Sequence, residues 1–304
     1  MSKILPRNFL ENAGEYIRNN CNPLYDALFA FHFGGGGAEA VVSGLERFRN
    51  GDGGFGHGLE HDFLMPDSSP MATTVALQIF REVGVGTHPI IDDALDYFQR
   101  SFDRDARRWW AVPQAVNDHP HAPWWHADEQ SGLTVIDANW GNPGAEIIGY
   151  LYAGGKSTGD PAKAELLDSA AAHLSSIDTF ASEHELYCYI RMFEMLDVND
   201  RRRFYEPIVR GIRQLVCLDA ERWNEYLPRP LDFVSRRSHP LFEVVEPWAG
   251  SQLDYLIDTC EDGLWYPTWE WGQYEEAWQT SKKNWTAKIT IGNLLILRDF
   301  GRLS

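Results

Sequence analysis

The sequence is short of three features that would place it in well-defined classes of protein: long apolar runs, basic residues and closely spaced cysteines. Apolar residues never approach the run of roughly 18 that a membrane-spanning helix requires, and the first residues contain no apolar signal-peptide region. We therefore expect a cytoplasmic protein without a membrane span.

Basic residues are few, because 27 Lys and Arg stand against 44 Asp and Glu and give a formal net charge of -17. A protein that binds the phosphate backbone of nucleic acids needs clustered Lys and Arg side chains that displace counterions. The charge balance excludes nucleic acid as an expected partner, and we expect a small-molecule substrate on the separate ground of the aromatic residues described below. No pattern in the sequence specifies an oligomeric state.

Cysteines are also few and widely spaced, and Cys21, Cys188, Cys217 and Cys260 form no CxxC pair. Cysteine-based metal and redox motifs place two or more of these residues at short spacing. We expect reduced and buried thiols, and we predict neither a cofactor nor a bound metal.

Aromatic residues, in contrast, are abundant, with 12 Trp, 12 Tyr and 16 Phe. Many of the tryptophans lie in segments rich in Pro, Gly and Asp, where a plain core would not need them. This distribution favours a pocket lined by aromatic side chains. The two tryptophan clusters comprise Trp109, Trp110, Trp124, Trp125 and Trp140, and then Trp265, Trp269, Trp271, Trp278 and Trp285.

Helical periodicity recurs along the whole chain in short segments separated by loops, and no strand-like alternation interrupts it. If each loop rich in Gly, Asp or Trp joins an outer helix to an inner one, six pairs result, and we predict one all-α domain of residues 1–304. The predicted pairs are 7–20 with a helix opening at Asn22-Pro23, 38–49 with 70–83, a helix from His88-Pro89 with one after Asn142-Pro143, 160–175 with 182–197, 200–216 with a short helix near 241, and 249–260 with a helix that follows residue 285 and ends at Gly301.

Internal repetition supports this pairing. Asp52-Gly53-Gly54-Phe55 in the second pair corresponds to Asp262-Gly263-Leu264-Trp265 in the sixth. Downstream, Thr73–Gly84 aligns without gaps on Thr290–Gly301. A supersecondary unit that repeats while its loops vary in length favours helix pairs closed into a ring, an (α/α)6 toroid, over an open regular array.

The DGGF and DGLW segments, each followed by an inner helix, make the chain resemble the repeat of the prenyltransferase and squalene-cyclase toroids. The resemblance covers the second and sixth pairs by sequence and the other four by spacing. It implies an α/α toroid with a central pocket, in a superfamily that contains cyclases, protein prenyltransferases and non-catalytic domains.

The chain also departs from that family. The DxDD acid motif of the type II cyclases is missing, and its nearest counterparts are the stretches at Glu60-His61-Asp62 and Asp67-Ser68-Ser69. The Asp, Cys and His zinc ligands of the protein prenyltransferases have no convincing positions either.

The candidate catalytic residues lie in the loop after the second outer helix, namely His57, Glu60, Asp62 and Asp67. A carboxylic acid held in an apolar pocket has a raised pKa, which a general acid needs to protonate an alkene, an epoxide or a glycosidic oxygen. Glu146 and Glu243 are further acidic candidates for the pocket. The alternative is a purely structural loop, in which Asp52 caps a turn and the glycines allow it.

The candidate substrate-binding residues combine aromatic, acidic and basic side chains. Aromatic faces stabilise a carbocation or stack on a sugar ring, and arginines grip a phosphate, diphosphate or carboxylate. We expect the outer-to-inner loops at 50–70, 105–142, 222–240 and 261–285 to bring them together at one end of the ring. For the basic residues, with Lys282, Lys283 and Lys288, the alternative is an ordinary charged surface. The candidates are Trp140, Glu146, Glu243, Trp269, Trp271, Trp285, Arg236 and Arg237.

Two further motifs admit simpler interpretations. The HPHAPWWH segment, with His119, His121 and His126, contains metal-ligating residue types, but its prolines and tryptophans favour a rigid packed loop. The run Asp92–Asp96 matches a diphosphate-binding DDxxD pattern, but it follows His88-Pro89 and favours an acidic first turn of a helix.

Three functional hypotheses follow. The first is an isomerase or lyase that uses a buried acid and aromatic walls to cyclise, rearrange or cleave a largely apolar small molecule. The second is a carbohydrate-active (α/α)6 hydrolase or lyase with paired carboxylates. The third is a toroid that binds a ligand or partner without catalysis.

Overall fold

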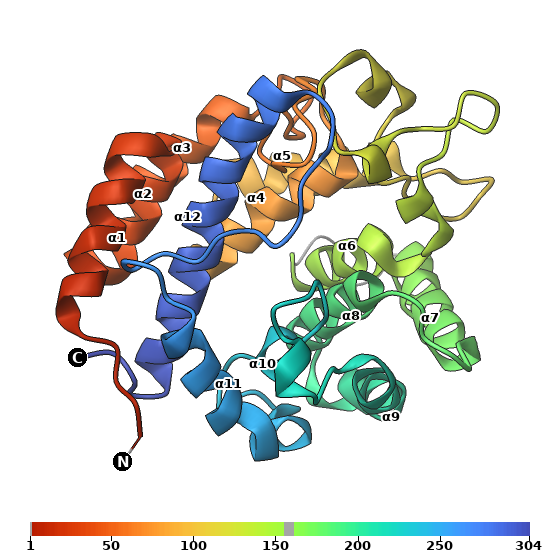
Figure 1. Cartoon of the computed structure of the whole chain (residues 1–304). Helices are drawn as coiled ribbons and strands as arrows, with labels where there is room; N and C mark the ends of the chain where they lie inside the picture. The colour runs from red at the N-terminus through yellow and green to blue at the C-terminus, as the bar shows by residue number, and fades with distance from the viewer. Residues whose placement is uncertain (1, 155–160) are drawn as a thin grey trace. The chain divides into compact units, whose positions relative to one another are not determined.

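The computed structural model of the chain describes residues 2–154 and 161–304. Within these residues the protein consists of twelve α-helices and short helical turns, with isolated β-bridges and no strand (Figure 1). The predicted all-α class is confirmed. In the same residues, every helix is either too short or too polar to cross a lipid bilayer.

The chain divides into two compact units, which are described separately. Unit 1 combines residues 1–47 with 216–304, and unit 2 comprises residues 48–215. The six-pair toroid and its single domain remain predictions at this point.

Unit 1 contains six helices from the two ends of the chain, and α2 contacts α1, α3 and α12 (Figure 1). The terminal segments lie together, because Leu5 N donates to Arg302 O at 2.8 Å and Ser304 N donates to Leu5 O at 3.2 Å. The helices are α1 (Arg7–Asn20), α2 (Pro23–Phe29), α3 (Ala38–Leu45), α10 (Pro230–Phe233), α11 (Glu246–Asp258) and α12 (Glu275–Asp299).

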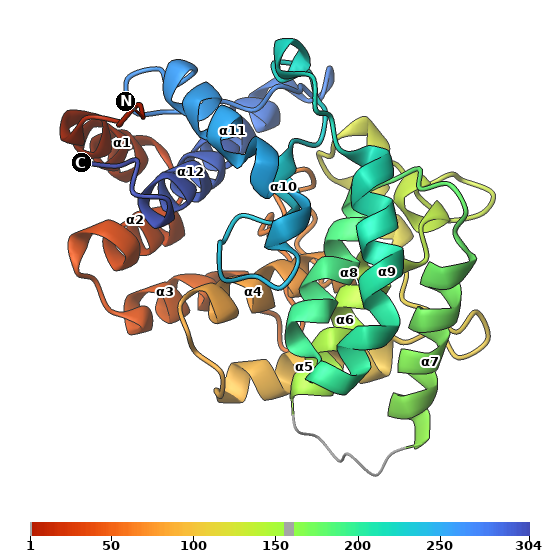
Figure 2. The same cartoon turned by 90° about the horizontal axis from the view of Figure 1, so that it is seen from below.

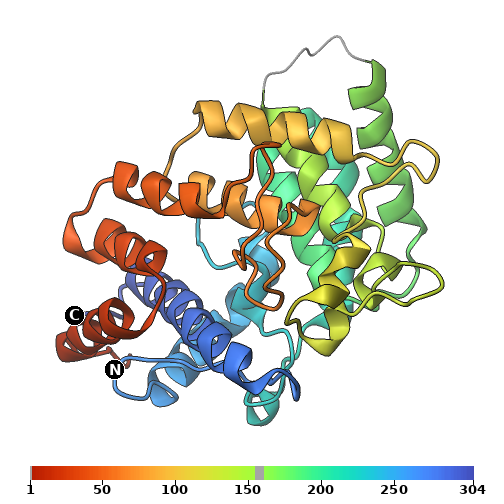
Figure 3. The same ribbon diagram turned by 90° about the horizontal axis from the view of Figure 1, so that it is seen from above.

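Unit 2 is built around a helix that is buried along most of its length, α6, which packs closely on α8 (Figure 2). This approach requires a glycine, since a Cβ on Gly149 would lie 2.9 Å from the Cα of Met192. On another side α4 lies beside α5 (Figure 3). The helices are α4 (Pro70–Glu82), α5 (Pro89–Ser101), α6 (Gly141–Ala153), α7 (Pro161–Ser176), α8 (Glu183–Met195) and α9 (Val198–Leu215).

Local capping signals fix many helix starts where the sequence predicts them. Asn22 accepts a hydrogen bond from Leu24 N at the start of α2, Ser69 accepts one from Ala72 N at the start of α4, and Ser182 accepts one from Glu185 N at the start of α8. These bonds satisfy backbone N–H groups that have no partner in the first turn of a helix.

For the fifth pair, the sequence predicts a short helix near residue 241 and no helix before it in the loop. Residues 242–244 form a single 3-10 turn, whereas the α-helix of this segment is α10 at Pro230–Phe233. Its start is marked by Pro230 at the first helical position and by Asp232, whose carboxylate accepts from Arg229 N at 2.9 Å. This helix-start signal is hard to distinguish from a loop in the sequence, because the residues around it include prolines.

The last helix starts earlier than predicted, at Glu275 instead of after residue 285. Glu275 and Glu276 lie in its first turn, where negative charge is favourable. Trp278 and Ser281 are both buried and three residues apart, which is helical spacing. Lys282 and Lys283 therefore lie within the helix.

The two repeated segments have the same local structure in the two units. Phe55 N donates to Thr73 Oγ1 at 3.0 Å, and its counterpart Trp265 N donates to Thr290 Oγ1 at 3.2 Å. The turn glycines match as well, with φ of +86° at Gly53 and +93° at Gly263. The sequence repeat therefore reflects a structural repeat.

A third pair shares part of this hydrogen-bonded arrangement, although the repeat found in the sequence does not include it. The buried indole of Trp109 donates to Phe98 O in the last turn of α5 at 2.7 Å, as Trp265 donates to Leu256 O in the last turn of α11 at 2.9 Å. In both cases a tryptophan after an outer helix satisfies a carbonyl at that helix's C-terminal end.

Candidate functional site

The loop that carries the catalytic candidates, here the glycine loop (residues 49–69), is folded by its own polar side chains. Asp52 Oδ1 accepts from Gly54 N at 3.0 Å and from Ser68 Oγ at 2.7 Å. Asn50 Nδ2 donates to Pro66 O at 2.9 Å. Asp52 thus has the capping role that the sequence left open as an alternative.

The glycine loop is joined to the segment between α5 and α6, here the tryptophan loop (residues 102–140). Phe63 and His121 form an antiparallel bridge. Beside it, Leu64 N donates to Pro120 O at 2.8 Å and Ala122 N donates to Asp62 O at 2.7 Å. Two of the four loops that were expected to meet therefore do so within unit 2.

Glu60 and Asp62 are buried beside this bridge, with 7% of each residue exposed. Asp62 N donates to Glu60 Oε1 at 3.3 Å. The neighbouring Leu59 and Phe63 are fully buried, and the buried His61 lies between the two acidic residues in the chain. The structure thus buries both carboxyl-bearing residues, and their role as acids stays a prediction.

His57 and Asp67, the other two catalytic candidates, are exposed. His57 has a left-handed φ of 54°, and its Nε2 lies 2.9 Å from Asn50 Oδ1. Both side chains lie in the turn that carries Glu60 and Asp62, but at the surface. The structure therefore does not give them the apolar surroundings that were expected.

The tryptophan loop adds a histidine pair and an indole to the same region. His121 Nε2 lies 3.2 Å from His126 Nδ1, and the two rings are stacked with centroids 5.4 Å apart. Trp125 contacts Phe63 edge-on at 5.0 Å between centroids, and its indole N–H is buried without a hydrogen-bond partner. Across residues 2–154 and 161–304, no three His, Cys, Asp or Glu side chains are grouped to hold a metal ion.

Glu146 proves to be part of a hydrogen-bonded cluster that links three helices. Its carboxylate accepts from Tyr150 Oη at 2.8 Å, from Gln78 Nε2 of α4 at 3.2 Å and from Arg191 Nη1 of α8 at 3.1 Å. Burial raises the pKa of Tyr150, and the nearby Glu146 charge raises it further. Burial lowers the pKa of Arg191, but its interactions with Glu146, Cys188 and Tyr150 together outweigh burial and leave that pKa raised.

This arrangement corrects the expected role of Glu146. A carboxylate with an arginine counterion and two further donors has its oxygens occupied within the protein. Glu146 is suited to joining α4, α6 and α8 and not to binding a substrate or donating a proton. Arg191 was not among the predicted site residues, although the sequence marks it. It is the lone charge in the apolar run Tyr187–Phe193, and a charge in such a run requires a buried partner.

Trp140 lies at the N-terminus of α6 next to a histidine. Its ring centroid is 5.1 Å from that of His173 of α7, and His173 Nε2 is 3.0 Å from Glu185 Oε1 of α8. The same Glu185 oxygen accepts from Gly141 N at 2.6 Å. Trp140 thus covers a polar contact between helices and keeps only part of its surface exposed.

The tryptophans of unit 1 separate into two groups. Trp269 contacts Trp285 at 5.1 Å and Tyr226 at 5.5 Å, both edge-on, and Lys288 Nζ lies 4.6 Å above the Trp285 ring. Trp269 and Trp285 are partly exposed, and the indole N–H of Trp269 is buried without a hydrogen-bond partner. Trp271 is 2% exposed and belongs to the core of unit 1.

The basic candidates do not form one cluster. Arg236 and Arg237 follow α10 and are exposed, and the Arg237 guanidinium lies over the ring of Phe300 at 4.7 Å, at the C-terminal end of α12. Lys283 is on the same helix, and at 1.5 Å per residue it is roughly 25 Å from Phe300. The expected grouping of Arg237 with Lys282 and Lys283 is therefore wrong.

The cause of this error is the α-helix at Pro230–Phe233, which was predicted to be part of a loop. Because the α-helix is α10, Arg236 and Arg237 lie in the segment that leaves it and not in the loop that enters it. Glu243 lies in the same segment, is exposed, and falls within the 3-10 turn Phe242–Val244.

Comparisons of this chain with models of known protein families, with curated proteins and with solved structures find no match.

Proposed function

We propose that the helix pairs close into the (α/α)6 toroid predicted from the sequence. Two observations support this proposal. A Cβ on Gly53 would lie 2.6 Å from Asp93 O of α5, the outer helix that follows its own pair, so this turn packs against the next pair. The equivalent Gly263 of the last pair lies against Phe9 O of α1, the outer helix of the first pair, as ring closure requires.

We further propose that the protein is an isomerase or lyase that protonates a largely apolar, terpenoid-like small molecule, with Glu60 or Asp62 as the acid. The observation that carries this proposal is the burial of both acidic residues beside the Phe63–His121 bridge, with 7% of each residue exposed. Burial disfavours the ionised form of a carboxyl group, which is the direction that a general acid requires.

The chemistry needs only protein groups and substrate. The acid transfers its proton to a carbon–carbon double bond or an epoxide oxygen, and positive charge develops on carbon. Aromatic faces stabilise that charge, and Phe63 and Trp125 are the aromatic side chains at the bridge. Loss of a proton from the product cation ends the reaction, and the proton returned to the carboxylate restores the acid.

The test is turnover of defined isoprenoids by the purified protein. Squalene and 2,3-oxidosqualene require an acid, whereas geranylgeranyl diphosphate also permits ionisation of the diphosphate, and products are separated by gas chromatography with mass spectrometry. We expect Glu60→Gln or Asp62→Asn to lower the rate roughly 10²- to 10⁴-fold, the usual effect of a lost general acid. Glu129→Gln is the matched control, because Glu129 is an exposed carboxylate in the adjoining tryptophan loop.

Two results contradict the proposal. The first is the absence of products from all three isoprenoids, and the second is turnover that neither loop substitution changes. Hydrolysis or elimination of an oligosaccharide by the same preparation, sensitive to the same two variants, would assign the acid to sugar chemistry instead.

A further inference from the structure

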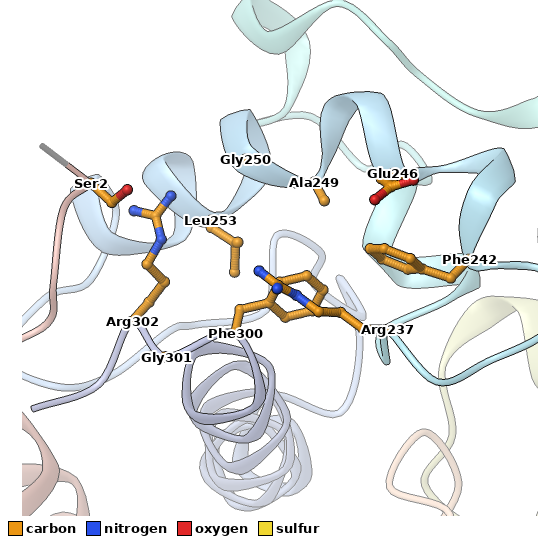
Figure 4. Close-up of a pocket in the computed structure, with 10 residues that line it drawn as sticks. All are labelled: Ser2, Arg237, Phe242, Glu246, Ala249, Gly250, Leu253, Phe300, Gly301 and Arg302. Carbon is orange, nitrogen blue, oxygen red and sulfur yellow. The ribbon is translucent and has the colours of Figure 1, made fainter.

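Unit 1 contains a pocket whose lining includes Arg237 but no other predicted site residue. It lies between α11 and the C-terminal end of α12 and has a volume of about 390 Å³ (Figure 4). Pockets of this kind hold small molecules when their volume is roughly 300–1,000 Å³, so this one is suited to a ligand at the small end of that range. Its apolar surface is formed mainly by Phe242, Leu253 and Phe300.

Two opposite charges line this pocket without neutralising each other. The guanidinium carbon of Arg237 lies over the Phe300 ring, 4.7 Å from its centroid, and Glu246 lies on the first turn of α11 (Figure 4). Neither side chain makes an ion pair with any residue in the described part of the chain. In contrast, the neighbouring Arg302 is already occupied, since its Nη1 donates to Asp254 Oδ1 and to Lys3 O, both at 2.8 Å.

The ligand that matches these groups is a small zwitterion with an apolar body. A guanidinium that lies over an aromatic ring presents its N–H edge to a carboxylate in a forked pair. A carboxylate such as Glu246 accepts from an ammonium group, and it opposes ligands with several negative charges, such as diphosphates. The apolar body then covers Leu253 and the two phenylalanines.

We propose that this pocket binds an apolar α-amino acid, with its carboxylate on Arg237, its ammonium group on Glu246 and its side chain on the apolar surface. This binding site is independent of the acid chemistry proposed for Glu60 and Asp62. Of the phosphate, diphosphate and carboxylate expected as partners of the arginines, it assigns a carboxylate to Arg237.

Calorimetric titration with three related probes tests the assignment. L-Phenylalanine carries both charges, 3-phenylpropionate lacks the ammonium group, and 2-phenylethylamine lacks the carboxylate. We expect L-phenylalanine to bind most tightly. We expect Arg237→Gln to weaken the binding of L-phenylalanine and 3-phenylpropionate by roughly tenfold or more, because a charged hydrogen bond is lost. The binding of 2-phenylethylamine should not change.

Conversely, we expect Glu246→Gln to weaken the binding of L-phenylalanine and 2-phenylethylamine by a similar factor. The binding of 3-phenylpropionate should not change. Arg7→Gln is the matched control, because Arg7 is an exposed arginine on α1 of the same unit with 79% of its side chain exposed. Thermal unfolding of each variant, followed by circular dichroism, confirms that the helices remain intact.

Three outcomes overturn the proposal. One is that none of the probes binds at 10 mM, roughly the weakest affinity worth assigning to a site. Another is binding of L-phenylalanine that neither Arg237→Gln nor Glu246→Gln changes. The last is equal affinity for L-phenylalanine and 3-phenylpropionate with no effect of Glu246→Gln, which would reduce the site to a simple anion pocket.

Discussion

The thiol of Cys21 follows the last turn of α1, where its Sγ lies 3.2 Å from the carbonyl oxygen of Lys283. Burial raises the pKa of Cys21 to about 12, and the Lys283 charge offsets only part of this effect. Because alkylating reagents attack the thiolate, a thiol with a raised pKa reacts slowly at ordinary pH.

We predict that iodoacetamide modifies Cys21 roughly a thousand times more slowly than a free cysteine peptide at pH 8.5, given the fraction of thiolate in each. The rate should rise about tenfold per pH unit from 8 to 10, whereas that of the peptide levels off near its own pKa. Mass spectrometry of the alkylated peptides measures both rates in the native protein. Fast alkylation of Cys21 at pH 8.5 would show that its thiol is not shielded as described.

At this same scale, the sequence singled out candidate carboxyl groups but did not predict their surroundings. Glu60 and Asp62 stood out because they have no capping duty in a loop rich in glycine. They are buried beside the bridge between Phe63 and His121, residues 58 positions apart in the sequence. Asp67 and His57 lie in the same loop and are exposed, and no local pattern distinguishes the two pairs.

Among the helices, the contact that differs most from expectation is the ion pair between Glu146 of α6 and Arg191 of α8. Removal of one partner leaves the other charge buried without its counterion. The free energy lost in this way is larger than the net contribution of the intact pair to stability. The Glu146 side chain is 1% exposed, whereas 40% of the Arg191 side chain is exposed, so solvent moderates the effect.

We predict that Arg191→Met lowers the free energy of unfolding by roughly 1–3 kcal/mol, below the 3–5 kcal/mol typical of a fully buried pair. Combining it with Glu146→Gln should recover part of this loss, because no buried charge is left behind. Urea denaturation of both single variants and the double variant measures the coupling. Strictly additive effects would contradict the pairing.

Helix boundaries were predictable where side chains mark them locally. Asn22-Pro23, Ser69-Pro70 and Ser182 each place a capping oxygen at the first turn, and the helices start there. The α-helix at Pro230–Phe233 was not predicted, and the start of α12 was set about ten residues too late. In both cases tryptophan, proline and charged residues suggested a loop, whereas burial of residues such as Trp278 in the folded chain maintains the helix.

At the scale of the whole molecule, the repeated turn is the feature that sequence and structure share most completely. Thr73 and Thr290 receive equivalent backbone hydrogen bonds in different units, although they are more than 200 residues apart. Repetition is visible in a sequence because each copy is local. Whether the copies close a ring depends on contacts between helices that the sequence does not encode locally.

The last prediction therefore concerns the contact that ring closure requires, between the turn at Gly263 and α1. A Cβ on Gly263 would lie 2.1 Å from Phe9 O, and its φ of +93° already disfavours any side chain. Gly272 also has a positive φ, of +67°, but a Cβ added there would have no other atom within 4 Å. Comparing the two substitutions to alanine separates backbone strain from the lost approach to α1.

We expect Gly272→Ala to cost about 1 kcal/mol of unfolding free energy through strain alone. Gly263→Ala should cost roughly 1–3 kcal/mol more, because α1 must move away or the turn must open. Gly53→Ala, against Asp93 O at 2.6 Å, should resemble Gly263→Ala if the two turns serve the same purpose. Equal effects of Gly263→Ala and Gly272→Ala in urea denaturation would show that the turn does not depend on α1, and the argument for closure at this point would fail.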